Sequence, residues 1–298
     1  MYNLLFSYSW EVSFIVFLQT FMKGFVLSFF KFLSDFATAN ILILICAIVY
    51  WAYDKELGKL LIINLTSTSA VNTCIKGFVG RMRPYATHTQ IKCLHPPAPD
   101  VSINDPTARG FSFPSGDASA ITGLCSQLVL YIKNKYILIG GILISLLVGI
   151  GRIGLGVHYP TDVIGAYVEA IIIAVILYYL FKKVENRMIL YGGLIIIAFL
   201  SMIFVKNSSY LSAVGGLICV LCGFIIEERY INFENNRTLI NSIVKIIIGI
   251  ILFFLIISLT KILLGNFEIF YKFFKVGLAN FIIFGLYPFL FKIIDNKI

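Results

Sequence analysis

Only 13% of the 298 residues are charged and 59% are hydrophobic, whereas about a quarter of the residues in soluble domains are charged. This composition excludes a soluble globular protein and predicts an all-α polytopic membrane protein, with room for about ten spans of roughly 20 residues. The net charge of +9 indicates no nucleic-acid partner, because the basic residues stand singly or in pairs between apolar runs. Membrane lipids and a phosphorylated lipid are the expected partners, and no protein partner can be named.

Three apolar segments occupy the first quarter of the chain. Residues 8–33 carry two lysines and form either a first span or a helix lying in the membrane interface. A short second span is expected over about 39–53 and a third over about 60–78. The middle of the third span, from Asn64 to Thr73, is small and polar, which suits close helix packing and hydrogen bonds between helices.

Residues 79–113 form the longest polar loop of the chain, with Pro96, Pro97, Pro99 and Pro106 in its second half. A loop of this length in a compact membrane protein is typically a lid or a binding element. Seven further spans are expected after it, at about 116–132, 136–151, 160–181, 188–205, 209–226, 239–260 and 273–291.

The basic residues between spans lie mostly on one side of the membrane. Eleven fall on that side: Lys55, Lys59, Lys133, Lys135, Lys182, Lys183, Arg187, Arg229, Arg237, Lys292 and Lys297. Outside the two polar loops, the other side holds Lys206, Lys261 and Lys272. The positive-inside rule makes the first side cytoplasmic, so the loops 79–113 and 151–159 share the extracytoplasmic face. Distant residues can then meet in one pocket, and a cell membrane is the expected location.

The loop before the sixth span holds Arg152, His158 and Asp162 between two apolar runs. Ionisable residues are costly in a membrane protein and by default mark a functional site. Pro160 favours a helix start, which places Asp162 in the first turn, where its carboxylate can reach the imidazole of His158. A carboxylate on one ring nitrogen leaves the other free as a nucleophile or base. The alternative is a short polar loop whose charges only satisfy one another.

Two more polar blocks point to the same face of the membrane. Lys76 and Arg83 follow the third span, and together with Arg152 they can gather three positive charges. The turn at Ser115 and Gly116 runs into the fourth span, so its backbone N–H groups and the serine hydroxyl form an anion site. An anion cradle with a histidine beside it has the parts needed for phosphoryl transfer.

These blocks resemble the signature of the type 2 phosphatidic acid phosphatase family of membrane phosphatases, K-x6-R-P, P-S-G-H and S-R-x5-H-x3-D. The matching residues are Lys76, Arg83, Pro84, Pro114, Ser115, Gly116, Arg152, His158 and Asp162. The resemblance implies a hydrolase of lipid phosphates or diphosphates that uses no metal and no cofactor, with a phosphohistidine on His158 and with Asp162 as its orienting partner. It also implies that the phosphate is bound by Lys76, Arg83, Ser115, the Gly116 N–H and Arg152.

The resemblance covers about residues 1–182 and implies a six-span phosphatase core, with the active site between the third, fourth and sixth spans. Residues 183–298 are then additional transmembrane helices of unknown role. Glu169 lies seven residues after Asp162, on about the same helix face, and we interpret it as structural. A phosphotransferase on the same scaffold, or a non-catalytic phospholipid-binding or transport protein, are the alternative functions.

Two positions depart from the family pattern. Gly151 replaces a serine, and Asp117 stands where the family has the histidine that protonates the leaving oxygen. Asp117 is either a catalytic acid or an acidic first-turn residue that stabilises the start of its helix. His88 or His95, in the long loop, is a second candidate for the acid. Without a histidine acid a diphosphate substrate suffers least, because a phosphate leaving group needs no proton.

Overall fold

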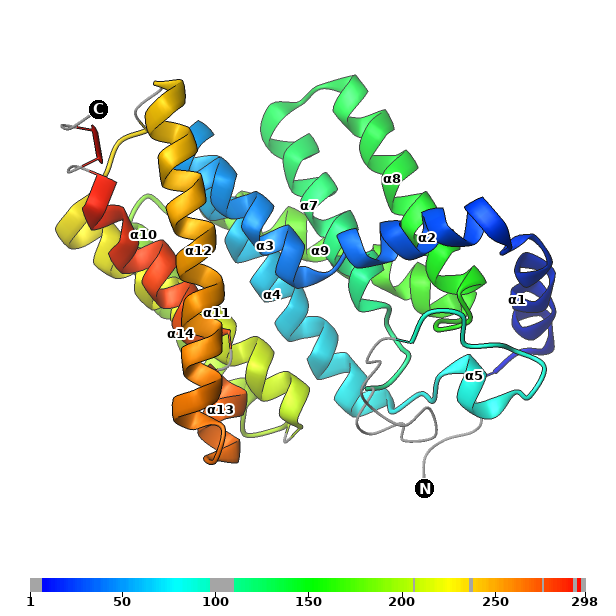
Figure 1. Cartoon of the computed structure of the whole chain (residues 1–298). Coiled ribbons are helices and arrows are strands. Elements are labelled where there is room, and N and C mark those ends of the chain that lie inside the picture. The colour runs from blue at the N-terminus through cyan, green and yellow to red at the C-terminus, as the bar shows by residue number, and fades with distance from the viewer. Residues whose placement is uncertain are drawn as a thin grey trace. The chain divides into compact units, whose positions relative to one another are not determined.

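The computed structural model describes residues 7–96, 110–205, 207–235, 238–274, 276–291 and 294–295, and every regular element in these ranges is helical (Figure 1). The elements are α1 (Ser9–Phe21), α2 (Gly24–Phe36), α3 (Ala39–Ile48), η2 (Val49–Tyr53), α4 (Lys55–Val79), α5 (Pro84–Thr87), α7 (Gly116–Ile132), α8 (Lys135–Gly154), α9 (Pro160–Lys183), α10 (Arg187–Ser201), α11 (Ser208–Ile226), η3 (Glu227–Ile231), α12 (Leu239–Leu264), α13 (Glu268–Phe274), α14 (Gly277–Phe281), η4 (Ile282–Leu286) and η5 (Tyr287–Leu290). The all-α prediction is confirmed.

Four helical segments are long and apolar enough to cross a membrane: α8, α9, Ser209–Ile231 and α12. The number rises to five if α1 and α2 together form one broken span. Each of the ten expected spans corresponds to helix, but several of these helices are short, and α4 is long but polar in its middle. The protein is therefore a polytopic membrane protein, with fewer helices of spanning length among the described residues than the ten expected.

The chain packs as two compact units. Unit 1 comprises Met1–Leu42 and Val71–Val175, and unit 2 comprises Ile43–Ala70 and Ile176–Ile298. Because these units are defined by packing, α3, α4 and α9 contribute residues to both. The division into a phosphatase core over 1–182 and an extension over 183–298 stays a prediction.

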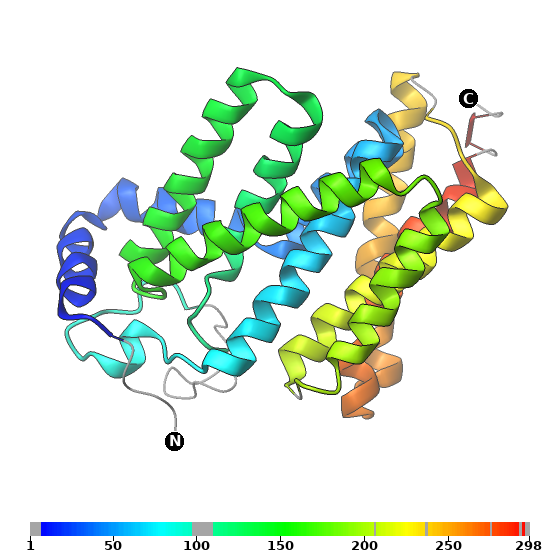
Figure 2. The same cartoon turned by 180° about the vertical axis from the view of Figure 1, so that it is seen from behind.

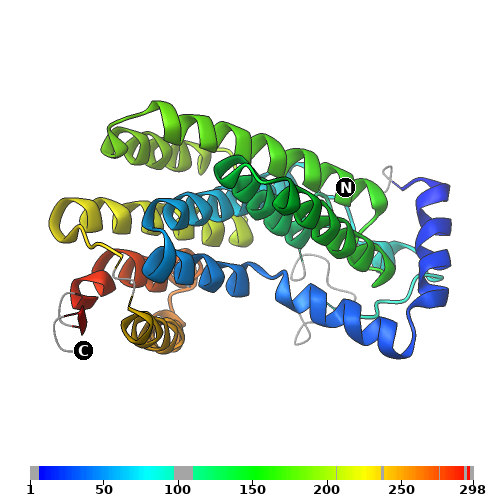
Figure 3. The ribbon, with the colours of Figure 1, turned by 90° about the horizontal axis from the view of Figure 1, so that it is seen from above.

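The first two helices of unit 1 do not form one straight span. α1 and α2 are bent by 117° relative to each other (Figure 3). The break coincides with Gly24, whose φ of +51° lies in the left-handed region that glycine adopts most readily. Val12 and Ile15 of α1 pack into a cluster with Ile91, Ala118, Ile153, Tyr159, Val163 and Ala166. This apolar cluster lies beneath the loops that carry the predicted site.

Within unit 1, α7 and α8 pack against each other as an antiparallel pair (Figure 2). Asn134 caps α8 by accepting a hydrogen bond from Tyr136 N, at 2.7 Å. The pairing brings the first turn of α7 and the last turn of α8 to the same end of the unit, where the second and third sequence blocks lie. Of the long loop 79–113, residues 97–109 lie outside the described residues, so the expected lid stays a prediction.

Unit 2 is built around aromatic side chains. Tyr50, Trp51 and Phe224 are buried with Phe284 and Tyr287, mostly in edge-to-face pairs. α11 also comes into close contact with η4, where a Cβ at Gly285 would lie 2.6 Å from Gly223 Cα. Of the basic residues used to orient the spans, Lys206, Arg237, Lys292 and Lys297 lie outside the described residues.

Candidate active site

The three sequence blocks meet at one cavity of about 440 Å³ in unit 1. Its walls include the predicted residues Lys76, Arg83, Gly116, Asp117, Arg152 and His158. They come from the end of α4, the segment before α5, the start of α7, the end of α8 and the loop before α9. The end of α2 and the loop over residues 88–96 complete the described lining. Ser115 and Asp162 lie next to this lining and contact it.

His158 belongs to a tight loop between α8 and α9 and is 2% exposed. The loop turns at Gly156, whose φ is +80° and where a Cβ would lie 2.3 Å from Lys92 O. Helix α9 begins at Pro160, as predicted, and Asp162 lies in its first turn. Local sequence therefore fixes the histidine and its predicted partner on either side of one helix start.

Asp162 is held by several donors close to His158. Its Oδ2 accepts hydrogen bonds from Ser112 Oγ at 2.5 Å and from Tyr159 N at 2.7 Å. His158 Nδ1 lies 3.6 Å from the same oxygen and 3.5 Å from Ser112 Oγ. These two distances exceed an ordinary hydrogen bond, and such contacts often shorten only when substrate is bound. The predicted pair is thus brought together, with Ser112 beside both members.

The other ring nitrogen of His158 faces a cation. Arg83 Nη1 lies 3.3 Å from His158 Nε2 and 3.1 Å from Val157 O. A guanidinium only donates hydrogen bonds, so we assign the lone pair to Nε2 and the proton to Nδ1. Burial, together with Arg83, Arg152 and Lys76, lowers the pKa of His158 well below its usual value. The imidazole is therefore neutral at physiological pH, with its free lone pair on the nitrogen that faces Arg83.

Polar groups without protein partners surround the cavity. Ser115 Oγ and Arg152 Nε are buried and have no hydrogen-bond partner among the described residues. The ammonium of Lys76 donates to Phe111 O at 3.0 Å and has further donors to offer. The first backbone N–H groups of α7 have no partner within the helix, because no turn precedes them. Since buried donors are normally satisfied, this arrangement is suited to an anion.

Asp117 points to a cation of the cavity. Its Oδ2 lies 2.9 Å from Nη1 of Arg152, which also donates a short hydrogen bond to Ser34 Oγ. Burial, followed by the neighbouring charge of Arg152, lowers the pKa of Arg83 to about 10, so that guanidinium remains charged at neutral pH. Three cations and one carboxylate of the sequence-predicted set therefore line this part of the cavity.

A buried network behind Asp162 was missed at the sequence level. Arg81 Nη1 lies 2.6 Å from Asp162 Oδ1, and Arg81 Nη2 lies 2.8 Å from Glu11 Oε2. Glu11 also accepts a hydrogen bond from Thr161 Oγ1, at 2.6 Å. The guanidinium of Arg81 stacks over the ring of Tyr159, at 3.9 Å from the centroid. A fully buried carboxylate in an otherwise apolar first helix is the signal that marks Glu11.

Glu169 lies in a polar cluster inside the helices of unit 1. Its Oε2 accepts hydrogen bonds from Asn72 Nδ2 and Ser119 Oγ, each at 3.0 Å. Asn72 belongs to the polar middle of the third predicted span. All three side chains are buried, which agrees with a structural role in joining α4, α7 and α9.

Comparisons with known proteins agree with this arrangement. The PAP2 superfamily matches residues 57–186, and the transmembrane extension of PAP2 superfamily phosphatases matches residues 211–296. The undecaprenyl-diphosphatase BcrC of Bacillus subtilis (strain 168) is 28% identical over 148 residues, which cover 49% of this chain and 70% of the relative. No solved structure matches the chain. The two family matches together span most of the sequence, including all three blocks, and the chain belongs to the PAP2 superfamily of membrane phosphatases.

Proposed function

We propose that this phosphatase hydrolyses a polyprenyl or other lipid diphosphate, or a lipid phosphate, through a phosphohistidine on His158. The observation that carries the proposal is the neutral imidazole of His158 at a cavity lined by three cations. Nε2 of His158 is the nucleophile, because Nδ1 faces Asp162 and Ser112. The cavity volume, about 440 Å³, is large enough for a phosphate or diphosphate head group.

Electrostatic stabilisation supplies most of the catalysis in this mechanism. In the transition state charge spreads over the phosphoryl oxygens, and Lys76, Arg83 and Arg152 offset it. Ser115 Oγ and the N–H of Gly116 add donors at the start of α7. As His158 attacks, it gains positive charge, which Asp162 stabilises through Nδ1. The three cations provide the charge that a metal ion provides in other phosphatases, so the proposed reaction uses no metal.

A diphosphate is the substrate that these residues favour. A phosphate leaving group needs less protonation than an alkoxide, and the histidine that usually donates the proton is replaced by Asp117. The carboxylate of Asp117 lies 2.9 Å from Nη1 of Arg152. We therefore assign to Asp117 the positioning of Arg152. The relative that acts on undecaprenyl diphosphate supports the same substrate class.

The proposed active site faces the extracytoplasmic side of a cell membrane. The support for this orientation is the excess of basic residues in the loops on the opposite side. A lipid diphosphate that reaches that face can place its head group in the cavity while its chain stays in the bilayer. Two introduced cysteines test this orientation on intact cells with an impermeant thiol reagent. A cysteine at Thr38, at the cavity, should be labelled, and a cysteine at Asn186, on the opposite side, should not.

The decisive experiment is phosphate release by detergent-purified protein in the presence of a chelator. The substrates are a polyprenyl diphosphate, phosphatidic acid and phosphatidylglycerol phosphate, and the comparison variant is His158→Ala. We expect turnover of the diphosphate at the highest rate and a loss of at least about 10³-fold in the variant. Radiolabelled phosphate should be trapped on His158 in the wild type. Retained turnover in His158→Ala contradicts the proposed nucleophile, and a faster phosphatidic acid reaction contradicts the proposed substrate preference.

A further inference from the structure

A second imidazole lies at the cavity that contains His158. His95 lines this cavity, and its Nε2 lies 2.7 Å from Oδ1 of Asp35, at the end of α2. Its side chain is 25% exposed, and that of Asp35 is 61% exposed, so the pair lies where the cavity meets solvent. Pairing through Nε2 leaves Nδ1 of His95 for a different partner. The mechanism proposed above gives this pair no role, although the sequence offered His95 as one of two loop candidates for the acid.

The loop that carries this second imidazole is fixed to the loop that carries the nucleophile. The side chain of Gln19, in α1, makes two hydrogen bonds to the loop that carries His95. Its Nε2 donates to Lys92 O at 2.6 Å, and its Oε1 accepts from Lys92 N at 3.1 Å. Leu94 N donates to Leu155 O at 3.0 Å. Ile91 is buried in the apolar cluster beneath the site. These long-range contacts give the imidazole a defined position beside the nucleophile.

A lipid monophosphate leaves as a basic alkoxide, and its cleavage needs a proton donor. The carboxylate of Asp117 is engaged by Arg152, at 2.9 Å. Lys76 and Arg83 are engaged in binding the phosphate in the proposed mechanism. Among the described residues that line the cavity, His95 is the one imidazole besides the nucleophile. Imidazole is the side chain best suited to carry and release a proton near neutral pH.

We propose that His95, held by Asp35, is the general acid that protonates the leaving oxygen, a role that rests on the proposed phosphatase function. In this step a bond forms between His158 Nε2 and phosphorus, and the bond from phosphorus to the leaving oxygen breaks. The proton on Nδ1 of His95 moves to that oxygen. His95 is then neutral and keeps its Nε2 proton, which it shares with Asp35. Asp35 acts as a positioning residue, since it contacts the imidazole and not the substrate.

His88 provides a matched control in the same loop. It is absent from the described lining of the cavity, and its ring packs edge-to-face on Tyr159, with 6.2 Å between centroids. Its Nε2 is buried without a hydrogen-bond partner among the described residues. Replacing His88 therefore removes an imidazole from the loop without removing the proposed proton donor.

A general acid contributes most where the leaving group is most basic. We would measure the release of the leaving group in the first turnover from a lipid diphosphate, from phosphatidic acid and from p-nitrophenyl phosphate. His95→Ala should slow release of the basic alkoxide from phosphatidic acid by about 10²-fold. Release from the other two substrates should fall by less than about tenfold, because their leaving groups need little protonation. His88→Ala should leave all three rates within about twofold.

Two further variants separate catalysis from loop structure. Adding Asp117→His to His95→Ala supplies an imidazole from α7 and should restore at least about tenfold of the phosphatidic acid rate. Asp35→Glu should keep most of the phosphatidic acid rate, and Asp35→Asn should lower that rate selectively, as His95→Ala does. Equal losses on all three substrates, or no loss on phosphatidic acid, would overturn the role of His95. If His158→Ala remains active or no phosphohistidine forms, the phosphatase mechanism itself fails, whatever the result at His95.

Discussion

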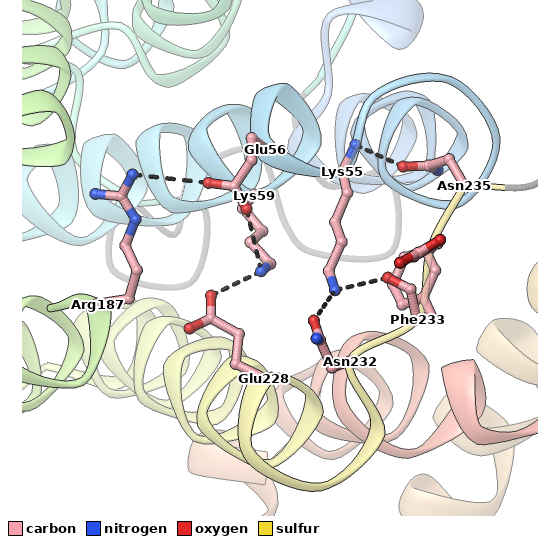
Figure 4. Close-up of a pocket in the computed structure, with 9 residues that line it drawn as sticks. Lys55, Glu56, Lys59, Arg187, Glu228, Asn232, Phe233 and Asn235 are labelled. Atoms are coloured by element: carbon pink, nitrogen blue, oxygen red, sulfur yellow. Dashed lines mark hydrogen bonds and ion pairs between the residues drawn. The ribbon is translucent and has the colours of Figure 1, made fainter. Parts of the chain in front are cut away.

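Each unit contains a charge cluster beside a cavity, and the two cavities are similar in volume. The two clusters differ in the balance between positive and negative charges. In unit 2 the cavity has a volume of about 490 Å³ and is lined by Lys55, Lys59 and Arg187 (Figure 4). Each of these cations has a carboxylate within 4 Å: Lys55 with Glu227 at 2.8 Å, Lys59 with Glu228 at 2.7 Å and Arg187 with Glu56 at 3.7 Å. Each of the three positive charges thus has a carboxylate partner, and Glu234 adds a further negative charge to the lining, so this cluster has no positive excess.

Among the described residues, the cavity of unit 1 is lined by more cations than carboxylates. Lys76, Arg83 and Arg152 line it, and Asp117 is the one carboxylate of the described lining that pairs with any of them. The second carboxylate, Asp35, pairs with the imidazole of His95. The comparison teaches that burial of charges does not by itself indicate an active site. An excess of one sign, with unsatisfied donors next to it, indicates a site for a ligand of the opposite sign.

Removing one cation from each cluster should have opposite consequences and gives the largest expected effect. Lys76→Gln should lower kcat/KM for a lipid diphosphate by about 10²–10³-fold, because a cation that offsets the charge of the transition state is lost. Lys59→Gln should leave kcat/KM within about twofold but should destabilise the fold by about 3–5 kcal/mol, since Glu228 and Glu227 lose their buried partner. Phosphate release and thermal unfolding of both variants test this. A large loss of activity in Lys59→Gln would contradict the comparison.

The sequence was sufficient to predict the local geometry of the candidate site where that geometry depends on short-range spacing. Helix α9 starts at Pro160, and Asp162 lies in its first turn, because both follow from local propensity. The blocks around Arg83, Ser115 and Arg152 meet at one end of unit 1, as their placement at helix ends predicted. Helix positions were also predictable, because long apolar runs determine them.

The partners that lie far apart in sequence could not be predicted. Glu11 reaches Arg81 only because α1 packs beside the start of α9, and no spacing rule relates the two residues. The pairing of His95 with Asp35 depends in the same way on the bend between α1 and α2. Among the described residues, fewer helices reach spanning length than the ten apolar runs predicted, because hydropathy reports an apolar run and not whether the helix continues without a break.

Glu11→Gln tests whether the negative charge of Glu11 helps to hold Asp162 in place beside the nucleophile. We expect an effect of intermediate size. The change keeps the shape of the side chain but removes the negative charge that lies 2.8 Å from Arg81 Nη2, while the contact of Arg81 with Asp162 stays. We expect kcat to fall about tenfold through misplacement of Asp162, with KM nearly unchanged, because Glu11 does not line the cavity. Steady-state kinetics give kcat and KM of the variant. The control is Glu185→Gln, a change of the same kind at an exposed residue. A change in KM alone would instead assign Glu11 to substrate binding.

The smallest expected effect is on the pH dependence of chemical modification at His158, which reports how the neighbouring cations influence its pKa. Burial and the three cations hold the pKa of His158 well below its usual value, so the imidazole stays neutral as the pH falls. Carbethoxylation requires the neutral ring, and its rate at His158, measured by mass spectrometry, should change by less than about twofold between pH 7.5 and pH 6. An ordinary imidazole, with a pKa near 6.5, loses about three quarters of its neutral form by pH 6. Lys76→Gln should raise the pKa of His158, so that its carbethoxylation rate falls more between pH 7.5 and pH 6 than in the wild type. Lys59→Gln should not change this fall. An unchanged profile in Lys76→Gln would show that Lys76 does not contribute to the lowered pKa of His158.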